Sequence, residues 1–185
     1  MNPSPRYSLG AIILHWLMAI LIIANVVIAL SVEGLPKPEA MYWMGIHKAN
    51  GITVLLLAVV RIFWRVTHPA PPFPATMKPW EITLARITHT AFYFLIVAIP
   101  LTGWLFVSKA SGGKPIDMYG LFNFPGFPFA PDRDVAEQVA GIHEVLGLGT
   151  LGLLALHVAG AAKHMFTDGF VRMIPGRAAA TPGPN

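Results

Sequence analysis

Four long apolar stretches constrain the fold of this chain more than any other feature. They cover about residues 9–32, 41–65, 81–107 and 135–165, and most of the charged residues within them lie near their ends. Each stretch supplies the roughly 20 residues that a helix needs to cross a hydrocarbon core of about 30 Å. Because lipid offers no hydrogen-bond partners, the backbone of such a stretch must be satisfied within a helix. The sequence therefore predicts an all-α integral membrane four-helix bundle.

The composition supports a membrane protein and narrows its chemistry. The chain is 55% hydrophobic and 12% charged, which is about half the charged fraction of a typical soluble domain. It contains no cysteine, and this excludes disulfides, thiolate metal sites, iron–sulfur clusters and covalently attached haem c. The sequence has no run of basic residues interleaved with aromatic residues, so it does not predict nucleic-acid binding. The seven histidines are therefore the leading candidates for redox or metal chemistry.

The chain is interpreted as one membrane domain followed by a short tail. Residues 1–176 form the four-helix domain, and residues 177–185 are predicted to be a disordered tail. The first apolar stretch is longer than the apolar region of a typical signal peptide, and no small-residue cleavage pattern closes it. We therefore expect it to be retained as the first membrane helix.

The basic residues predict the orientation of the helices in the membrane. Eight lie in the two termini and the segment between the second and third stretches, against five on the opposite side. The eight are Arg6, Arg61, Arg65, Lys78, Arg86, Lys163, Arg172 and Arg177. Because cytoplasmic segments carry the excess of Lys and Arg, both termini are predicted to be cytoplasmic.

Four histidines lie within the apolar stretches at two matched depths. His15 and His157 lie near the predicted cytoplasmic ends of their helices, whereas His47 and His143 lie near the opposite ends. His143 and His157 are fourteen residues apart, so they nearly share a helix face and lie about 21 Å apart along the axis. One helix can thus serve two stacked sites, each completed by another helix. Paired axial histidines are typical of six-coordinate haem b, so the spacing favours two haem b groups over zinc, which prefers about four close ligands.

The residue four positions after each of these histidines is small. These residues are Ala19, Gly51, Gly147 and Ala161. Residues at positions i and i+4 share a helix face, so a small side chain there leaves room for a flat macrocycle. Small residues also occur in ordinary packing between membrane helices.

Two further histidines have several open interpretations. His89 starts the third stretch near the depth of His15 and His157, so it is an alternative haem ligand or a hydrogen-bond donor to a propionate or a quinone. His164 follows His157 by seven residues, where it can bind a quinone headgroup or simply face lipid headgroups.

Short motifs in this order resemble the prokaryotic cytochrome b561 family. The motifs are Leu14-His15-Trp16-Leu17, Ile46-His47-Lys48 before Gly51, His143-Glu144, Leu156-His157 and Arg172-Met173-Ile174-Pro175. The resemblance covers about residues 7–175 and implies a four-helix bundle in the bacterial inner membrane that holds two b haems. Carried over to this chain, the haem ligands are His15, His47, His143 and His157.

The resemblance also implies a function in electron transfer. One compact branch of the family is similar to superoxide oxidase, which oxidises superoxide outside the inner membrane and reduces ubiquinone. On this reading the chain is a superoxide:ubiquinone oxidoreductase, and His164 matches a position linked to quinone binding. An alternative is a haem subunit that carries electrons for a hydrogenase or dehydrogenase partner without its own catalysis. A third hypothesis from another class is a haem-free transporter or proton pathway that uses the same histidines.

Overall fold

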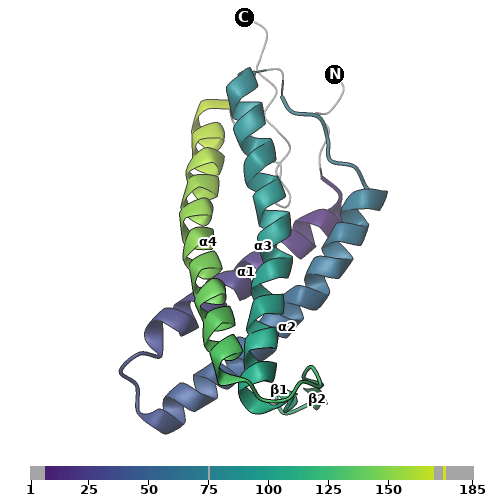
Figure 1. Cartoon of the computed structure of the whole chain (residues 1–185). Coiled ribbons are helices and arrows are strands. Elements are labelled where there is room, and N and C mark those ends of the chain that lie inside the picture. Colours follow the sequence, from purple (N-terminus) through teal and green to yellow (C-terminus); the bar gives the residue numbers. More distant parts are fainter. Residues whose placement is uncertain (1–6, 75, 169–172, 174–185) are drawn as a thin grey trace, which may run out of the picture.

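Four long helices make up 76% of the part of the chain that the structure describes. The structure is a computed structural model that describes residues 7–74, 76–168 and 173. The helices are α1 (Leu9–Ser31), α2 (Lys37–Thr67), α3 (Pro79–Ser111) and α4 (Arg133–Asp168). Over the described residues, all four are long and apolar enough to cross a membrane. The predicted all-α membrane four-helix bundle is confirmed (Figure 1).

Three of the helices are longer than the apolar stretches that predict them. α2 starts at Lys37 and α3 at Pro79, and each has a proline in its first turn. Proline is favoured there because the first backbone N–H groups of a helix have no partner within it. α3 continues to Ser111 and ends at Gly112, which has a φ of 70°. Hydropathy marks the part of a helix that lipid surrounds, whereas proline and glycine mark where the helix begins and ends.

The helices pack in sequence order. α1 packs against α2, α2 against α3, and α3 most extensively against α4. A core formed by Met18, Val54, Ala58 and Ile96 joins α1, α2 and α3. α4 is therefore attached to the bundle mainly through α3. Side chains on α4 can face α1 and α2 without direct backbone packing between those helices.

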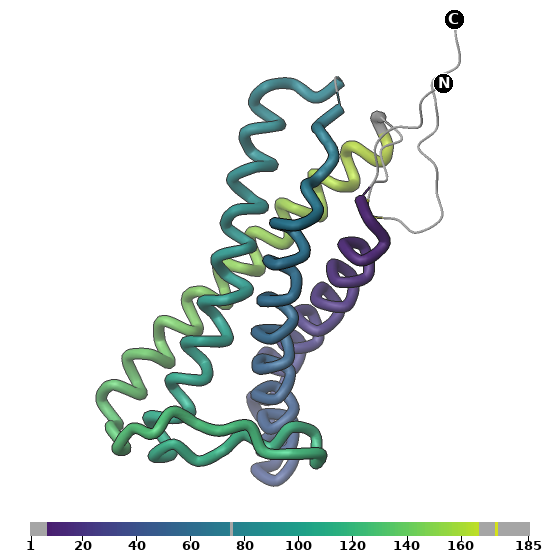
Figure 2. Tube along the Cα trace, turned by 90° about the vertical axis from the view of Figure 1, so that its right-hand side faces the viewer, coloured from purple at the N-terminus to yellow at the C-terminus, as the bar shows by residue number. Residues whose placement is uncertain are grey.

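Among the described residues, a short hairpin between α3 and α4 is the one element that was not predicted from the sequence. β1 (Ile116–Met118) pairs with β2 (Phe122–Phe124) in antiparallel fashion. Tyr119 and Gly120 form the turn with φ values of 59° and 75°, and the Asp117 carboxylate accepts hydrogen bonds of 3.0 and 3.2 Å from the Gly120 N–H. Figure 2 shows that the segment after α3 runs across one end of the bundle. We call this end the hairpin end and the opposite end, which carries the α2–α3 connection, the connector end.

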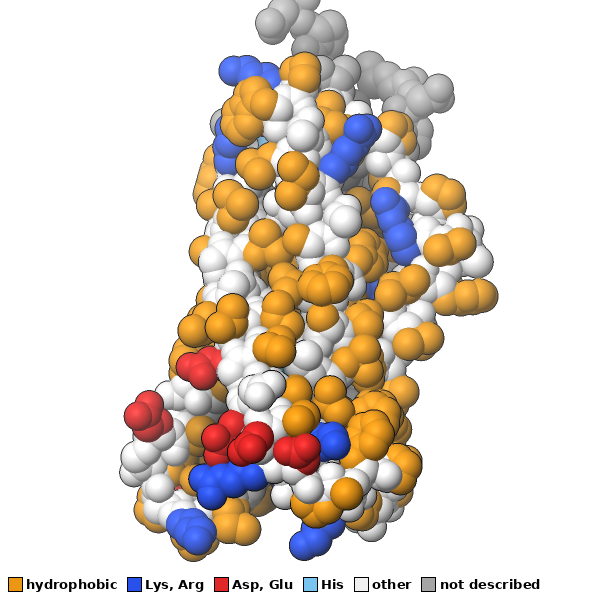
Figure 3. Space-filling model, viewed as in Figure 1, with side chains coloured by type: hydrophobic (Ala, Val, Ile, Leu, Met, Phe, Trp, Pro, Cys, Tyr) orange, Lys and Arg blue, Asp and Glu red, His pale blue; other side chains and the backbone are white. Residues whose placement is uncertain are grey.

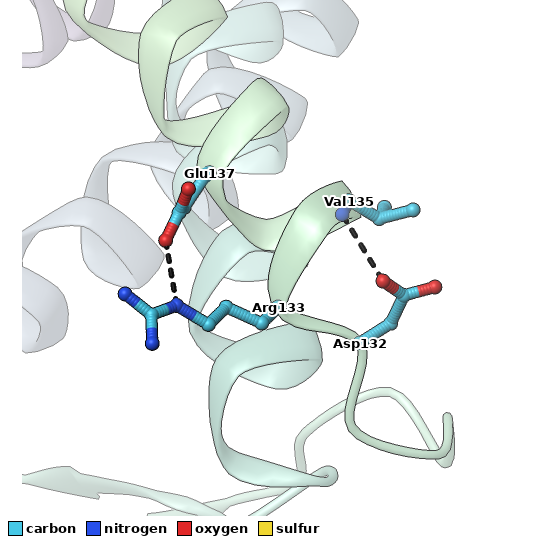
Figure 4. A network of polar contacts seen from close by, with 4 residues as sticks. All are labelled: Asp132, Arg133, Val135 and Glu137. Carbon is cyan, nitrogen blue, oxygen red and sulfur yellow. Dashed lines mark hydrogen bonds and ion pairs between the residues drawn. The ribbon is translucent and has the colours of Figure 1, made fainter.

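Polar contacts mark the start of α4 at the hairpin end. The Asp132 carboxylate accepts a hydrogen bond of 3.1 Å from the Val135 N–H, as a helix-capping side chain does. Across the first turn of α4, Arg133 Nε lies 2.7 Å from Glu137 Oε1 (Figure 4). Both side chains of this ion pair are largely exposed, so the pair contributes little to stability.

The surface is apolar between two polar ends. In the view of Figure 3, hydrophobic side chains cover most of the length of the molecule. Acidic side chains on this face gather near the hairpin end together with some basic ones, whereas Lys and Arg alone are visible toward the connector end. This is the distribution that a membrane-spanning bundle requires. The predicted tail at residues 177–185 lies outside the described residues.

Candidate functional site

The structure brings two of the predicted histidines together near the hairpin end. His47 on α2 and His143 on α4 have ring centres 6.2 Å apart, with their planes at 80°. Both side chains are half-buried. We call them the hairpin-side pair.

Main-chain carbonyl groups of neighbouring helices orient both rings of this pair. His47 Nδ1 donates to Asn25 O on α1 at 3.2 Å, and Asn25 Nδ2 donates back to His47 O at 3.2 Å. His143 Nδ1 donates to Ile99 O on α3 at 2.9 Å. A carbonyl oxygen only accepts hydrogen bonds, so Nδ1 carries the proton in each ring. The Nε2 atoms are therefore left with a lone pair, which is the state in which histidine binds a metal.

Gly103 lets the ring of His143 lie directly against α3. A Cβ atom at this position would lie 2.9 Å from His143 Cε1 and 3.2 Å from Nδ1. Thr102, beside it, has its hydroxyl 3.2 Å from His143 Nδ1. Residues 99–103 of α3 thus form the backing against which His143 is held.

A second group of histidines lies near the connector end. His15 on α1 and His157 on α4 have ring centres 6.1 Å apart. His89 on α3 also lies next to His157, and the centres of these two rings are 5.7 Å apart. We call His15 and His157 the connector-side pair, and His89 its neighbour. The distances alone give His157 two possible partners, because α1 and α3 both present a histidine to it.

The connector-side pair has a cation at hydrogen-bonding distance, and within the described residues the hairpin-side pair has none. Arg61 on α2 has its Nη2 atom 3.4 Å from His15 Nδ1, and its Nη1 atom donates to Ala11 O at 3.4 Å. The guanidinium group also lies over the ring of Tyr93, 6.0 Å from its centre.

His164 follows His157 on α4 by seven residues and lies next to an ion pair between α3 and α4. Lys163 forms a salt bridge with Glu81, whose side chain is almost completely buried. The Lys163 ammonium also lies 5.3 Å from the centre of the Trp80 ring. His164 is half-buried and close enough to Glu81 to interact with it electrostatically. The structure therefore groups His164 with Glu81 and its ion pair, apart from the ring cluster around His157.

The residues that orient the histidines were not predicted from the sequence. They are Asn25, Ile99, Thr102 and Gly103. One signal was available for Asn25, because it is the only Asn in the first apolar stretch, and intramembrane polar residues usually have a specific partner. Ile99 and Gly103 act through a carbonyl group and an absent side chain, which no local pattern reveals.

Together the fold and the paired histidines define a multi-pass membrane protein with two candidate metal-binding histidine pairs. Comparison with known proteins gives the family. Residues 6–176 match the family described as prokaryotic cytochrome b561, and the chain belongs to this family. As a member of this family, the chain is a bacterial membrane protein that transfers electrons, and the family implies that it binds haem b.

Two relatives match over most of the chain. One is "Cytochrome b561 homolog 2" of Escherichia coli (strain K12), which is 32% identical over 170 residues, 90% of this chain and 88% of the relative. Another is "Probable superoxide oxidase CybB" of Yersinia pestis, which is 27% identical over 176 residues, 92% of this chain and 96% of the relative.

The ring separations of both pairs fit a haem iron held between two imidazoles. A metal–nitrogen bond of about 2 Å on each side, plus roughly 1 Å from each nitrogen to its ring centre, puts two opposed imidazole centres about 6 Å apart. The observed separations are 6.2 and 6.1 Å. A Cβ atom at Gly51 or Gly147 would meet nothing within 4 Å, so both helices keep open space next to the hairpin-side pair. Among the described residues, no three His, Asp or Glu side chains converge as a metal-binding group.

Proposed function

We propose that the chain is a di-haem b cytochrome that carries electrons across the membrane between an external donor and membrane quinone. The observation that carries the proposal is the presence of two histidine pairs at two depths, with ring centres 6.2 and 6.1 Å apart. The hairpin-side pair is proposed to hold one haem and the connector-side pair a second. Held between two histidines, haem would supply one-electron redox chemistry, which suits electron transfer rather than O₂ binding.

The protein residues supply position, orientation and an apolar surrounding for this chemistry. α4 carries one histidine of each pair, and the carbonyls of Asn25 and Ile99 fix the tautomers of His47 and His143. A ligating histidine whose other nitrogen donates to a carbonyl is held in one orientation and becomes a more basic ligand. These bonds therefore leave Nε2 of His47 and His143 unprotonated and oriented before any metal binds.

The proposed donor is superoxide and the proposed acceptor is ubiquinone. One relative that covers 92% of this chain is named a probable superoxide oxidase, and this supports superoxide as the donor. The quinone is proposed to bind near the connector end. There, His89 lies beside His157, and His164 lies by the buried carboxylate of Glu81. Either imidazole can donate a hydrogen bond to a quinone oxygen.

The first experiment is a haem assay on the purified chain in detergent. The pyridine haemochrome and the reduced-minus-oxidised spectrum are expected to give two low-spin b haems per chain. His47→Ala and His143→Ala are each expected to remove one of them. His68→Ala is the matched control. His68 directly follows α2, stacks on Trp64 of that helix and is proposed to hold no cofactor. One haem in the unaltered chain would refute the di-haem proposal, and none would favour a haem-free transport function.

A second experiment separates the enzyme from an electron-transfer subunit. The purified chain is given enzymatically generated superoxide and a soluble ubiquinone analogue, and ubiquinol is measured with and without superoxide dismutase. Superoxide-dependent ubiquinol formation by the chain alone supports the superoxide:ubiquinone oxidoreductase. A chain that holds both haems but reduces quinone only with a hydrogenase or dehydrogenase partner would instead be an electron-transfer subunit.

A further inference from the structure

Arg61 is a cation inside the bundle, placed at the depth of the connector-side pair. It follows His47 on α2 by fourteen residues, the same interval that separates His143 from His157 on α4. At this interval the two positions on a helix nearly share a face, about 21 Å apart along the axis. α2 therefore presents a histidine to the hairpin-side pair and an arginine to the connector-side pair.

Contacts confirm that Arg61 faces the connector-side histidines. Its Nη2 atom lies 3.4 Å from His15 Nδ1. It also interacts electrostatically with His157 and His89. The same side chain reaches Ala11 O on α1 and the Tyr93 ring on α3. Arg61, on α2, is thus held by contacts with α1 and α3 beside the connector-side pair.

No carboxylate balances this charge in the described part of the chain. The salt bridges there join Arg133 to Glu137 and Lys163 to Glu81. The hydrogen-bonding partners of Arg61 are a carbonyl oxygen and an imidazole nitrogen. A charge in a low-dielectric interior acts on its neighbours far more strongly than the same charge in water.

The hairpin-side pair has the opposite electrostatic surroundings. His47 and His143 donate their Nδ1 protons to carbonyl oxygens, which are the negative ends of peptide dipoles. Such bonds make the imidazole a stronger electron donor and favour the oxidised metal. Lys48 follows His47 in the chain and interacts with it electrostatically, yet over the described residues no hydrogen bond joins it to either ring of the pair.

We propose that Arg61 raises the one-electron potential of the group held at the connector-side pair above that of the group at the hairpin-side pair. The inference rests on the proposed di-haem function. A reduced centre carries one more negative charge than its oxidised form, so a nearby cation stabilises the reduced form. At equilibrium the electron is then held at the end where quinone is proposed to bind. Arg61 can only donate, so its hydrogen bond to His15 Nδ1 requires that Nδ1 carries no proton. If His15 binds a metal through Nε2, Nδ1 carries the proton and this bond is lost. The guanidinium then stays beside the ring through its bond to Ala11 O and keeps its charge.

The test is a spectroelectrochemical measurement of the purified haem-loaded chain, with Arg61→Gln, Arg61→Lys and the exposed control Arg133→Gln. The unaltered chain is expected to give two midpoint potentials, and His15→Ala identifies the one that belongs to the connector-side pair. Arg61→Gln is expected to shift that potential downward, and Arg61→Lys is expected to keep most of the original value because it keeps the charge. Arg133→Gln removes an equal charge at the surface and is expected to leave both potentials in place.

Several outcomes would overturn the inference. Unchanged potentials in Arg61→Gln would do so, as would an equal shift of both potentials, which indicates a general disturbance of the bundle. A Lys variant that shifts as far as the Gln variant would show that charge is not the cause. If Arg61→Gln binds no haem, Arg61→Lys decides, because its potential must then stay close to that of the unaltered chain. Failure to find two haems in the unaltered chain would refute the proposed function itself, whereas two haems insensitive to Arg61 would refute this inference alone.

Discussion

His143 on α4 donates a hydrogen bond of 2.9 Å from Nδ1 to the carbonyl oxygen of Ile99 on α3. α3 carries no histidine of the hairpin-side pair, yet it sets the orientation of one. The close packing of α3 against α4 therefore has a role at the site besides holding the bundle together. It places a carbonyl group where the imidazole needs an acceptor, and this leaves Nε2 available for a metal.

Gly103→Ala is expected to disturb the hairpin-side pair without unfolding the chain. The added Cβ atom would lie 2.9 Å from His143 Cε1, so the ring must move away from α3 and its bond to Ile99 O must lengthen. We expect loss or weaker binding of one haem, measured by haem content and by the low-spin spectrum. Loss of the hydrogen bond alone costs about 1 kcal/mol, too little to unfold a domain.

Gly152→Ala is the matched control for this substitution. Gly152 lies on α4, the helix that carries His143, and a Cβ atom there would meet nothing within 4 Å. Alanine also favours a helix more than glycine does. This variant is expected to keep its haem content. Equal haem loss in both variants would contradict the role of Gly103.

The depth pairing of the histidines was predictable because hydropathy locates each residue along a membrane helix. His47 with His143 and His15 with His157 meet in the structure as the sequence analysis expected. Their roles as haem ligands remain a prediction. Hydropathy does not give the rotation of a helix about its axis, because side-chain packing sets that rotation. The sequence therefore did not decide whether His89 lies near His157, and in the structure it does.

The hairpin could not be read from the sequence because its strands are only three residues long. Strand patterns become recognisable over about four to eight residues. Its stability comes from tertiary contacts, since Ile116 and Met118 are buried against Ala49 and Ile52 of α2. A bulky residue at positive φ in the turn, Tyr119, also departs from the Asn-Gly or Asp-Gly pair that usually identifies such a turn.

Tyr119→Phe is expected to loosen the hairpin and leave the helices intact. The Tyr119 hydroxyl donates to Asn50 Oδ1 at 2.8 Å and lies 2.9 Å from Thr53 Oγ1. Asn50 is 7% exposed, so removing the hydroxyl leaves a buried amide oxygen without this donor, at a cost of about 1–3 kcal/mol. Hydrogen exchange followed by mass spectrometry should show faster exchange in residues 112–132 and no change in α1.

Tyr42→Phe serves as the control for loss of a tyrosine hydroxyl, because Tyr42 is 63% exposed. Its exchange pattern should match that of the unaltered chain. Hairpin exchange that is unaffected by Tyr119→Phe would mean that apolar packing alone holds the hairpin on α2.

Variants of His15 and His89 are expected to separate the two candidate partners of His157. Their ring centres lie 6.1 and 5.7 Å from that of His157, so distance does not choose between them. We expect His15→Ala to remove one haem, because an open axial position weakens binding and changes the spin state. His89→Ala is expected to keep both haems and to slow ubiquinone reduction. Haem loss from His89→Ala with retention in His15→Ala would reverse the assignment.

The orientation of the bundle can be tested with single cysteines because the natural chain has none. Leu121→Cys places a thiol at the hairpin tip, where Leu121 is 81% exposed. Thr76→Cys places one in the exposed α2–α3 connection. The excess of basic residues on the side of that connection predicts that it is cytoplasmic together with both termini. A membrane-impermeant maleimide should therefore label Leu121→Cys in intact spheroplasts and Thr76→Cys only after lysis.

The same pair of variants makes the orientation test self-controlled. Full labelling of both after lysis shows that each thiol is reactive, so a difference in intact spheroplasts reports the side of the membrane. The reverse pattern would place the hairpin in the cytoplasm. It would also put the hairpin-side pair at the cytoplasmic face, and external superoxide would then have to reach the connector-side pair. Orientation therefore decides which pair receives the donor's electron, and the proposed direction of transfer depends on it.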